Sequence, residues 1–285
     1  MTRIPPLSHD RINRAVSEAL SEDLGLVGDI TTNATIPETA RISTSITARQ
    51  AGVVSGIELA QAAFAQMNAS ISFHAEKHDG NATKPGDVIA TIAGPARAIL
   101  SAERVALNFM GAMSGIASLT RDYVNAVAHT KTTIVDTRKT TPGLRAFEKY
   151  AVRCGGGRNH RFGLFDAILI KDNHIAACGG IALALKAAKN NASHLVKIEI
   201  EVDTLDQLHE VDFAIADCVL LDNMTLDTLR EAVGHVDGRA LTEASGGVNL
   251  DTVAAIAQTG VDLISVGALT HSAPVLDLGL DFKTS

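Results

Sequence analysis

The second half of the chain contains six short apolar runs, each ending on a polar or small residue, and their regular spacing constrains the fold most. The runs end at residues 136, 172, 201, 222, 245 and 267. The last three intervals are 21, 23 and 22 residues, the length that one strand, one loop and one helix need together. A capping box at 204–207 and the cap residue Asn249 mark helix starts between the runs. Repeated strand–helix units predict a parallel sheet.

A barrel and a doubly wound open sheet both place ligands at the carboxyl ends of parallel strands. The sequence shows six strands rather than eight, and no G-x-G-x-x-G motif follows the first of them. We therefore expect an α/β fold with an incomplete, open barrel. The first half differs, because its pattern predicts helices over residues 10–20 and 58–66, strands over 42–48, 71–73 and 88–92, and a helix or helix pair over 101–128.

Composition limits the class of protein. The 285 residues are 46% hydrophobic and 20% charged, typical of a globular protein rather than a disordered or fibrous one. The longest apolar run, residues 175–185, is too short to span a membrane, and no secretory signal is recognisable at the start, so we expect a cytoplasmic location without membrane contact. Three well-separated cysteines, Cys154, Cys178 and Cys218, are predicted to be buried thiols.

The distribution of charge points to a small anionic ligand. The formal net charge is −7, which argues against a nucleic-acid-binding surface. Residues 133–171, however, contain eight Lys and Arg against three Asp and Glu. A cationic segment in an acidic protein indicates a pocket for a small anion, the plain alternative being a solvated helix face.

Three motifs lie in this cationic segment. In residues 136–145, two cations follow a strand, and a Thr-Pro pair signals a helix whose N-terminus would bind an anion. The glycine run 155–157 leads into His160 and Arg161, and it would let backbone amides approach a charged ligand. Lys171 directly follows an apolar strand and would lie in the mouth of a barrel. A lysine at this position is more readily explained by a role in the active site than by a structural role.

Acidic and small residues end the later strands. Glu201 and Asp222 end consecutive strands, so their carboxylates are placed to share a hard divalent cation. Glu199 lies on the same side of its strand as Glu201, but deeper. Small residues in 243–247 and 265–268 match the phosphate-binding loops that barrels form after their last strands. These features predict substrates that carry phosphates and carboxylates.

Taken with these features, nine blocks of sequence closely resemble the quinolinate phosphoribosyltransferase family, over residues 20–282. The blocks are residues 22–24, 28–32, 101–104, 136–145, 155–161, 169–175, 221–224, 243–247 and 265–272. The resemblance implies an N-terminal α/β sandwich domain over 1–115, onto which the tail 273–285 packs, and an open barrel over 116–272. It also implies a magnesium-dependent reaction of quinolinate and phosphoribosyl pyrophosphate, giving nicotinate mononucleotide, pyrophosphate and carbon dioxide in NAD biosynthesis.

The resemblance further implies roles for individual residues, and a homodimer, or an assembly of such dimers, whose sites are shared. The quinolinate carboxylates would be bound by Arg138, His160 and Arg161, with Arg104 reaching them from the partner subunit. Lys139 and Lys171 would line the junction between pyridine and ribose, and Glu201 and Asp222 would hold the ribose hydroxyls and Mg²⁺. The 5′-phosphate would be bound by Ser245, Gly246, Gly247, Gly267 and His271.

Other activities stay open on the sequence alone. The nearest are a nicotinate-using transferase and the related protein of molybdenum-transport operons, which have the same fold. A non-catalytic sensor of pyridine carboxylates would not need both acids and both lysines. An aldolase-like barrel would use Lys171 as a Schiff-base amine.

Overall fold

The computed structural model describes residues 4–282 and divides the chain into two compact units, which are interleaved in sequence. Unit 1 comprises Met1–Arg121, Pro142–Gly156 and Ser272–Ser285, and unit 2 comprises Asp122–Thr141 and Gly157–His271. Of the segment predicted to belong to the barrel domain, residues 142–156 thus pack with unit 1. None of the described helices, including the 32-residue helix α4 (Ala96–Val127), has the length and apolar character of a membrane span.

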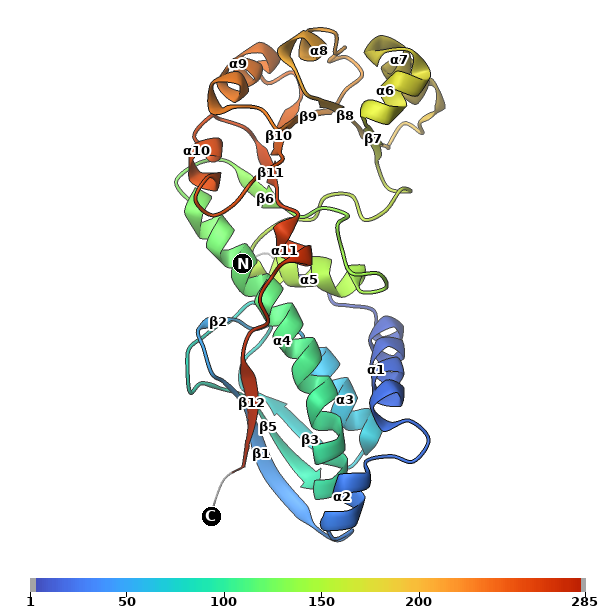
Figure 1. The fold of residues 1–285 in the computed structure, drawn as a ribbon, viewed down its shortest axis with the longest axis vertical. Helices are drawn as coiled ribbons and strands as arrows, with labels where there is room; N and C mark the ends of the chain where they lie inside the picture. Colours follow the sequence, from blue (N-terminus) through green and yellow to red (C-terminus); the bar gives the residue numbers. More distant parts are fainter. Residues whose placement is uncertain (1–3, 283–285) are drawn as a thin grey trace. The chain divides into compact units, whose positions relative to one another are not determined.

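Unit 1 is built on a four-stranded antiparallel sheet (Figure 1). Its strands lie in the order β12 (Leu278–Phe282), β1 (Arg41–Ala48), β5 (Val88–Pro95) and β3 (Ser72–Ala75). A small antiparallel pair joins β2 (Gly52–Val53) to β4 (Ala82–Thr83). The C-terminal strand β12 pairs with β1, so the end of the described chain completes the N-terminal sheet.

The helices of unit 1 bury the apolar faces that the sequence predicts. They are α1 (His9–Leu24), α2 (Ile30–Thr35), α3 (Ile57–Met67), most of α4, and α5 (Arg145–Gly155). Helix α1 buries Ile12, Val16 and Leu20, a spacing of four that forms one stripe. Helix α3 buries Phe64, whose ring lies 6.0 Å from that of Phe73 on β3. The helices predicted at 10–20 and 58–66 are therefore confirmed, with longer ends.

Unit 2 is the open parallel barrel predicted from the strand spacing. Its six strands lie in the order β6 (Thr133–Val135), β11 (Leu263–Ser265), β10 (Leu241–Ser245), β9 (Cys218–Asp222), β8 (Ile198–Val202) and β7 (Ile168–Ile170). All five pairings are parallel. No pairing within the described chain joins β6 to β7, so the barrel is open between its first and its second strand. A single bridge between Val135 and Arg158 lies on that side.

Helices connect the strands and surround the curved sheet on its outer side (Figure 1). They are α6 (Asp172–Cys178), α7 (Ile181–Asn191), α8 (Leu205–His209), α9 (Leu226–Val236) and α10 (Val253–Ala257). The short helix α11 (Ala268–His271) follows the last barrel strand, β11. Half of the predicted capping box is present at α8, where Thr204 Oγ1 accepts a hydrogen bond from Gln207 N at 3.2 Å. The Gln207 side chain accepts from the backbone N–H of Asp203 rather than from that of Thr204. In the turn before α10, Asn249 Oδ1 accepts a bond from Thr252 N at 3.1 Å.

Two local expectations in the segment between β6 and β7 are wrong. Helix α5 begins at Arg145, not at the Thr-Pro pair, and its cap residue Leu144 makes no side-chain hydrogen bond. The glycine run is not a loop that exposes amides. Gly155 ends α5, and Gly156 follows with a positive φ of 98° that closes the helix.

Close packing against α4 leaves no room for a side chain at position 155. A Cβ at position 155 would lie 2.4 Å from the backbone oxygen of Ala117 on α4, whereas one at Gly234 on α9 would have no neighbour within 4 Å. Gly155→Ala should therefore destabilise the protein by about 1–3 kcal/mol. Gly234→Ala, its control, should be neutral or stabilising by up to about 1 kcal/mol, because Ala favours a helix. Denaturant unfolding of both variants tests this, and equal stabilities would contradict the packing argument.

Candidate functional site

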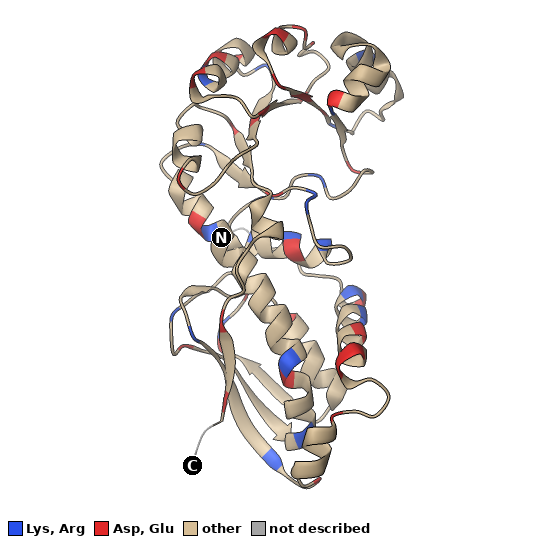
Figure 2. Ribbon diagram, viewed as in Figure 1, with Lys and Arg blue, Asp and Glu red and all other residues tan. Residues whose placement is uncertain are grey.

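A cavity of about 750 Å³ lies among residues that end or follow the strands of the barrel. It contains twelve of the thirteen residues that the sequence analysis singled out. These are Arg138, Lys139, His160, Arg161, Lys171, Glu201, Asp222, Ser245, Gly246, Gly247, Gly267 and His271. Parallel strands end at one edge of their sheet, which is why residues so distant in sequence converge here. Figure 2 shows the charged residues on the ribbon.

Arg104 is the residue that the structure does not bring to this cavity. It lies on α4 in unit 1 and lines a separate cavity of about 270 Å³ with Glu22, Asp23 and Asn108. Every residue that lines that second cavity belongs to unit 1. Within one chain, then, Arg104 is not part of the barrel cavity.

The cationic side of the cavity contains a buried donor that lacks an acceptor. Arg161 uses Nη1 to donate to the backbone oxygen of Ala167 at 3.1 Å, but its buried Nε has no hydrogen-bond partner in the described chain. Burial lowers the pKa of Arg161, and the neighbouring Arg138 lowers it further. A buried donor without an acceptor is costly, and two cations side by side repel each other. An anionic ligand between them would relieve both costs.

The Lys171 ammonium is ion-paired with the Glu201 carboxylate across neighbouring strands. Lys171 also precedes α6, where its backbone N–H donates to Nδ1 of His174 at 2.9 Å. His174 therefore caps a helix, a role that the sequence left undecided. Schiff-base lysines stand in apolar pockets or beside other cations, and an ion-paired lysine does not match that pattern.

The loop after β10 has the backbone shape of a phosphate-binding loop. Gly246 and Gly247 have φ of 88° and 62°, and a Cβ at Gly246 would lie 2.1 Å from Asn223 Oδ1. The backbone N–H groups of both glycines make no hydrogen bond to the described part of the chain. Successive free N–H groups in such turns form an anion-binding concavity.

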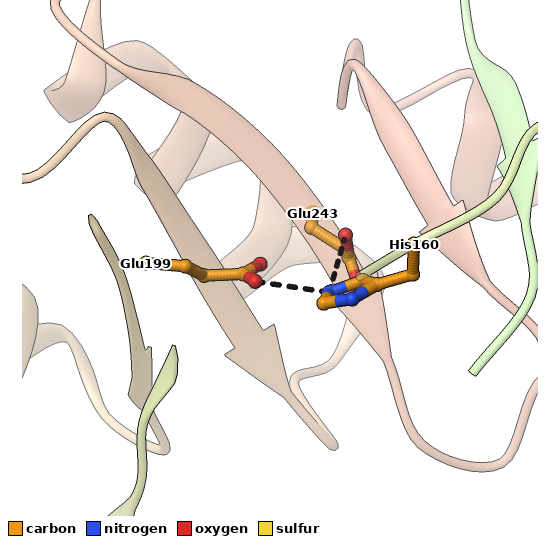
Figure 3. A group of neighbouring side chains, drawn as sticks. All are labelled: His160, Glu199 and Glu243. Atoms are coloured by element: carbon orange, nitrogen blue, oxygen red, sulfur yellow. Dashed lines mark ion pairs between the residues drawn. The ribbon is translucent and has the colours of Figure 1, made fainter. Parts of the chain in front are cut away.

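His160, a predicted site residue, is clustered with Glu199 and Glu243, two acids that the sequence analysis did not include among the site residues (Figure 3). His160 Nε2 lies 2.9 Å from Glu199 Oε2 and 3.7 Å from Glu243 Oε2. Burial, together with the adjacent Glu199 carboxylate, raises the pKa of the Glu243 carboxyl to about 8, while His160 opposes the shift. A weak signal for both acids exists in the sequence, because each stands two residues before a predicted site residue and so shares its face of the strand.

The cysteines take no part in the cavity. Cys154 is buried, and burial raises its pKa to about 12, so the thiol is unreactive. The prediction that all three are buried is wrong for Cys178, which is exposed on α6. Cys218 is partly buried, and its thiol donates to Glu199 Oε1 at 3.4 Å.

The fold and the cavity define a protein of the α/β-barrel class whose site is built for a small, multiply charged anion. Family models narrow that class. The model described as quinolinate phosphoribosyl transferase, N-terminal domain, matches residues 29–114, and the C-terminal domain model matches residues 116–281. The chain belongs to the quinolinate phosphoribosyl transferase family.

Individual relatives agree with the family models. Over 279 residues the chain is 43% identical to the probable nicotinate-nucleotide pyrophosphorylase (carboxylating) of Bacillus subtilis, covering 98% of this chain and 96% of the relative. It is 44% identical over 279 residues to the Mycobacterium leprae nicotinate-nucleotide pyrophosphorylase (carboxylating), covering 95% and 97%. The solved nicotinate-nucleotide pyrophosphorylase of Francisella tularensis matches with a TM-score of 0.92 and 38% identity, covering 99% and 100%. The family and the fold predicted from sequence are confirmed.

The raised pKa of Glu243 predicts a pH dependence of stability. In the unfolded chain this group ionises near 4.5, whereas the folded protein keeps its proton up to about 8. Unfolding thus releases a proton between these values, and the contribution of Glu243 to stability falls as pH rises. Glu243→Gln removes that loss, so the stability of the variant relative to wild type should rise between pH 5 and 8, by at most about 1.4 kcal/mol per pH unit.

Denaturant titrations of both proteins at pH 5, 6, 7 and 8 measure this difference. The exposed Glu231 on α9 provides the control, since Glu231→Gln should show a difference that does not change with pH. A flat profile for Glu243→Gln as well would contradict the raised pKa.

Proposed function

We propose that this protein converts quinolinate and phosphoribosyl pyrophosphate into nicotinate mononucleotide, pyrophosphate and carbon dioxide, as a step of NAD biosynthesis. The observation that carries the proposal is the convergence of Arg138, Lys139, Arg161 and Lys171 on one cavity with two carboxylates and two glycine loops. The cations suit a pyridine dicarboxylate, and the glycine loops suit a phosphate. Membership of the family supports this reaction over others of the same fold.

Arg138, His160 and Arg161 are the proposed binding residues for the two quinolinate carboxylates. The buried Nε of Arg161 supports this role, because a carboxylate oxygen would supply the acceptor that it lacks. Ser245, Gly246, Gly247, Gly267 and His271 are proposed to bind the 5′-phosphate. At Gly267 a Cβ would lie 3.2 Å from His271 Nε2, so the glycine leaves room between the loop and that side chain.

The residues present fit a magnesium ion. Glu201 and Asp222 offer carboxylate oxygens, and Mg²⁺ in enzymes that use phosphorylated substrates is often held by one or two carboxylates, water and the substrate phosphates. Bound there with the substrate, the ion would neutralise charge on the pyrophosphate leaving group. Asp222 Oδ2 accepts a bond from Asn223 Nδ2 at 2.6 Å, which orients the carboxylate.

The protein residues act mainly by position and charge. Cleavage of the anomeric bond builds positive charge on the sugar, which Glu201 and Asp222 would stabilise from the ribose side. The pyridine nitrogen attacks the sugar and becomes cationic. Loss of the adjacent carboxylate as carbon dioxide then leaves a carbanion that this cationic nitrogen stabilises, and a proton taken up from water at the same carbon completes nicotinate mononucleotide. Lys139 is our proposed residue for assisting the decarboxylation.

We further propose a homodimer in which Arg104 of the partner subunit completes the quinolinate site. Arg104 belongs to unit 1 and is not among the residues that line the barrel cavity in unit 2, which supports this arrangement. The cytoplasmic location stays a prediction from the sequence.

The function is tested by release of labelled carbon dioxide from carboxyl-labelled quinolinate. The assay contains phosphoribosyl pyrophosphate and magnesium, and each component is omitted in turn. We expect release only with all three, and nicotinate mononucleotide in equal amount. No release from folded protein, with turnover of nicotinate instead, would assign the chain to a nicotinate-using transferase.

Lys139→Ala should abolish turnover without affecting the fold. Its control is Lys131→Ala, because Lys131 is exposed and ion-paired with Asp262 away from the cavity. We expect the control to keep wild-type activity and both variants to keep the wild-type circular dichroism spectrum. An active Lys139→Ala protein would refute the site assignment.

Mixing two inactive variants tests whether the sites are shared between subunits. If Arg104 acts in the partner's site, dimers of one Arg104→Ala and one Lys139→Ala chain contain one intact site. Random reassociation of equal amounts should then restore about a quarter of wild-type activity. Absence of any recovery, with subunit exchange demonstrated by mass labelling, would mean that each site is built from one chain.

A further inference from the structure

Three acidic side chains form a buried layer beneath the cavity. Asp136, Glu199 and Glu243 have exposed fractions of 0%, 8% and 1%. Asp136 directly follows β6, Glu199 lies on β8 and Glu243 on β10, so they come from alternate strands. In α/β barrels, alternate strands contribute the side chains of one interior layer. We call these three residues the carboxylate floor.

The carboxylate floor binds the segment that crosses the open side of the barrel. Asp136 Oδ2 accepts a bond from Asn159 Nδ2 at 2.6 Å, and Asp136 Oδ1 accepts one from the backbone N–H of His160 at 2.9 Å. Glu199 then faces Nε2 of the same histidine at 2.9 Å. The floor therefore fixes His160 at both its backbone and its ring.

Both ring nitrogens of His160 are engaged inside the protein. The backbone N–H of Arg161 donates to His160 Nδ1 at 2.7 Å, so Nδ1 is an unprotonated acceptor. The proton of the neutral ring is therefore on Nε2, which points at Glu199. This arrangement also ties the backbone of Arg161 to the ring, and Glu199 in turn attracts the Arg161 guanidinium.

We propose that Asp136, Glu199 and Glu243 are positioning residues that hold His160 in one ring orientation and tautomer, and through it place Arg161 for the substrate carboxylates. The inference rests on the proposed function, since it assigns these acids a task in quinolinate binding. It explains why three carboxylates are buried below a site for an anion, where they would otherwise repel the ligand. Asp136 accepts hydrogen bonds from Asn159 and from the backbone N–H of His160, and Glu199 faces His160 and attracts Arg161, so these two charges are not presented to the substrate. Glu243, whose pKa burial raises to about 8, is uncharged at neutral pH and does not repel an anion.

A metal ion is the competing explanation for the same side chains. Ligand atoms of His160, Glu199 and Glu243 all lie within 4.8 Å of one another, a grouping that a divalent cation can use. Coordination through Nε2 requires that nitrogen to give up its proton, but the bond from Arg161 N to Nδ1 leaves Nε2 as the protonated nitrogen. A metal at this position would therefore have to break the bond that fixes Arg161.

The test separates the hydrogen bond from the charge at position 199. Glu199→Gln keeps an oxygen that accepts from His160 Nε2, and its amide would face the Cys218 sulfur, whereas Glu199→Leu removes the acceptor. Glu231→Leu, at an exposed glutamate on α9, is the control. Long-range proton–nitrogen NMR of histidine-labelled protein reports the tautomer, and calorimetry reports quinolinate binding. The His160 signal is assigned by its loss in His160→Gln.

We expect wild type, Glu199→Gln and Glu231→Leu to show His160 with a protonated Nε2 and an unprotonated Nδ1. Glu199→Leu should lose this single tautomer and bind quinolinate at least about tenfold more weakly, the order expected for a lost hydrogen bond to a charged group. The Michaelis constant for phosphoribosyl pyrophosphate should change less than about twofold, because a positioning role acts on one substrate only.

Two results would overturn the inference. One is a Glu199→Leu protein that folds and binds quinolinate like wild type. The other is wild-type protein in which added Zn²⁺ or Mn²⁺ shifts the His160 signals and strengthens quinolinate binding, which would assign the cluster to a metal. If wild type binds no quinolinate at all, the proposed function fails, while the tautomer measurement still tests whether Glu199 fixes the ring.

Discussion

The two hydrogen bonds that Asp136 accepts from Asn159 and His160 hold together the side of the barrel that strand pairing leaves open. A closed barrel would pair β6 with β7, but here β6 pairs with β11 and β7 with β8. Arg158 forms the single bridge to Val135. Asp136 then binds the exposed Asn159 and the backbone of His160, and His160 and Arg161 line the cavity. The open side is thus what allows His160 and Arg161 to enter the cavity from a loop rather than from a strand.

Burial of acids at this place has an electrostatic reason. A buried carboxylate loses its hydration and needs a cation or hydrogen-bond donors in return. The carboxylate floor finds these in Asn159, His160 and the Arg161 guanidinium. The cations in turn face a cavity wide enough for a ligand, so acid, base and ligand form alternating layers. Loss of the buried acids would leave the cationic side chains without their counter-charge, and loss of the cationic side chains would leave the ligand without its own.

The barrel can be predicted from the sequence because it is built from strand–loop–helix units, and each unit repeats the same local pattern. Strand ends such as Glu201, Asp222 and Ser245 come at nearly constant intervals, and each contributes to the cavity at the same edge of the sheet. The same reasoning was wrong at the Thr-Pro pair and the glycine run, where packing decides. Gly155 is required by contact with Ala117, a residue 38 positions away, and no spacing pattern records that contact.

The buried acids Glu199 and Glu243 show a second limit of prediction from the sequence. Glu199 and Glu243 stand in strands that read as ordinary barrel strands, and only their depth separates them from Glu201 and Ser245 one step further along. Depth along a strand depends on the stagger between neighbours. Here Glu199 is in register with Cys218 and Glu243 with Leu220, pairings that arise only when the sheet forms. The deeper acid of each strand then meets His160. Glu201 and Ser245, one step further along, line the cavity, and of the two deeper acids only Glu243 also lines it.

This division by depth matches what the proposed reaction demands. Positive charge must be stabilised at the sugar, and negative charge at the carboxylates and the leaving group, within one cavity. Flexible side chains of both signs would neutralise each other there, as Lys171 and Glu201 do in the absence of a ligand. The carboxylate floor avoids this at the proposed quinolinate end, because Asp136 and Glu199 are buried and hold the backbone and the ring of His160, and Glu243 is buried beside them. Arg161 is then left with an unused buried donor, and a substrate carboxylate is the group that can satisfy it.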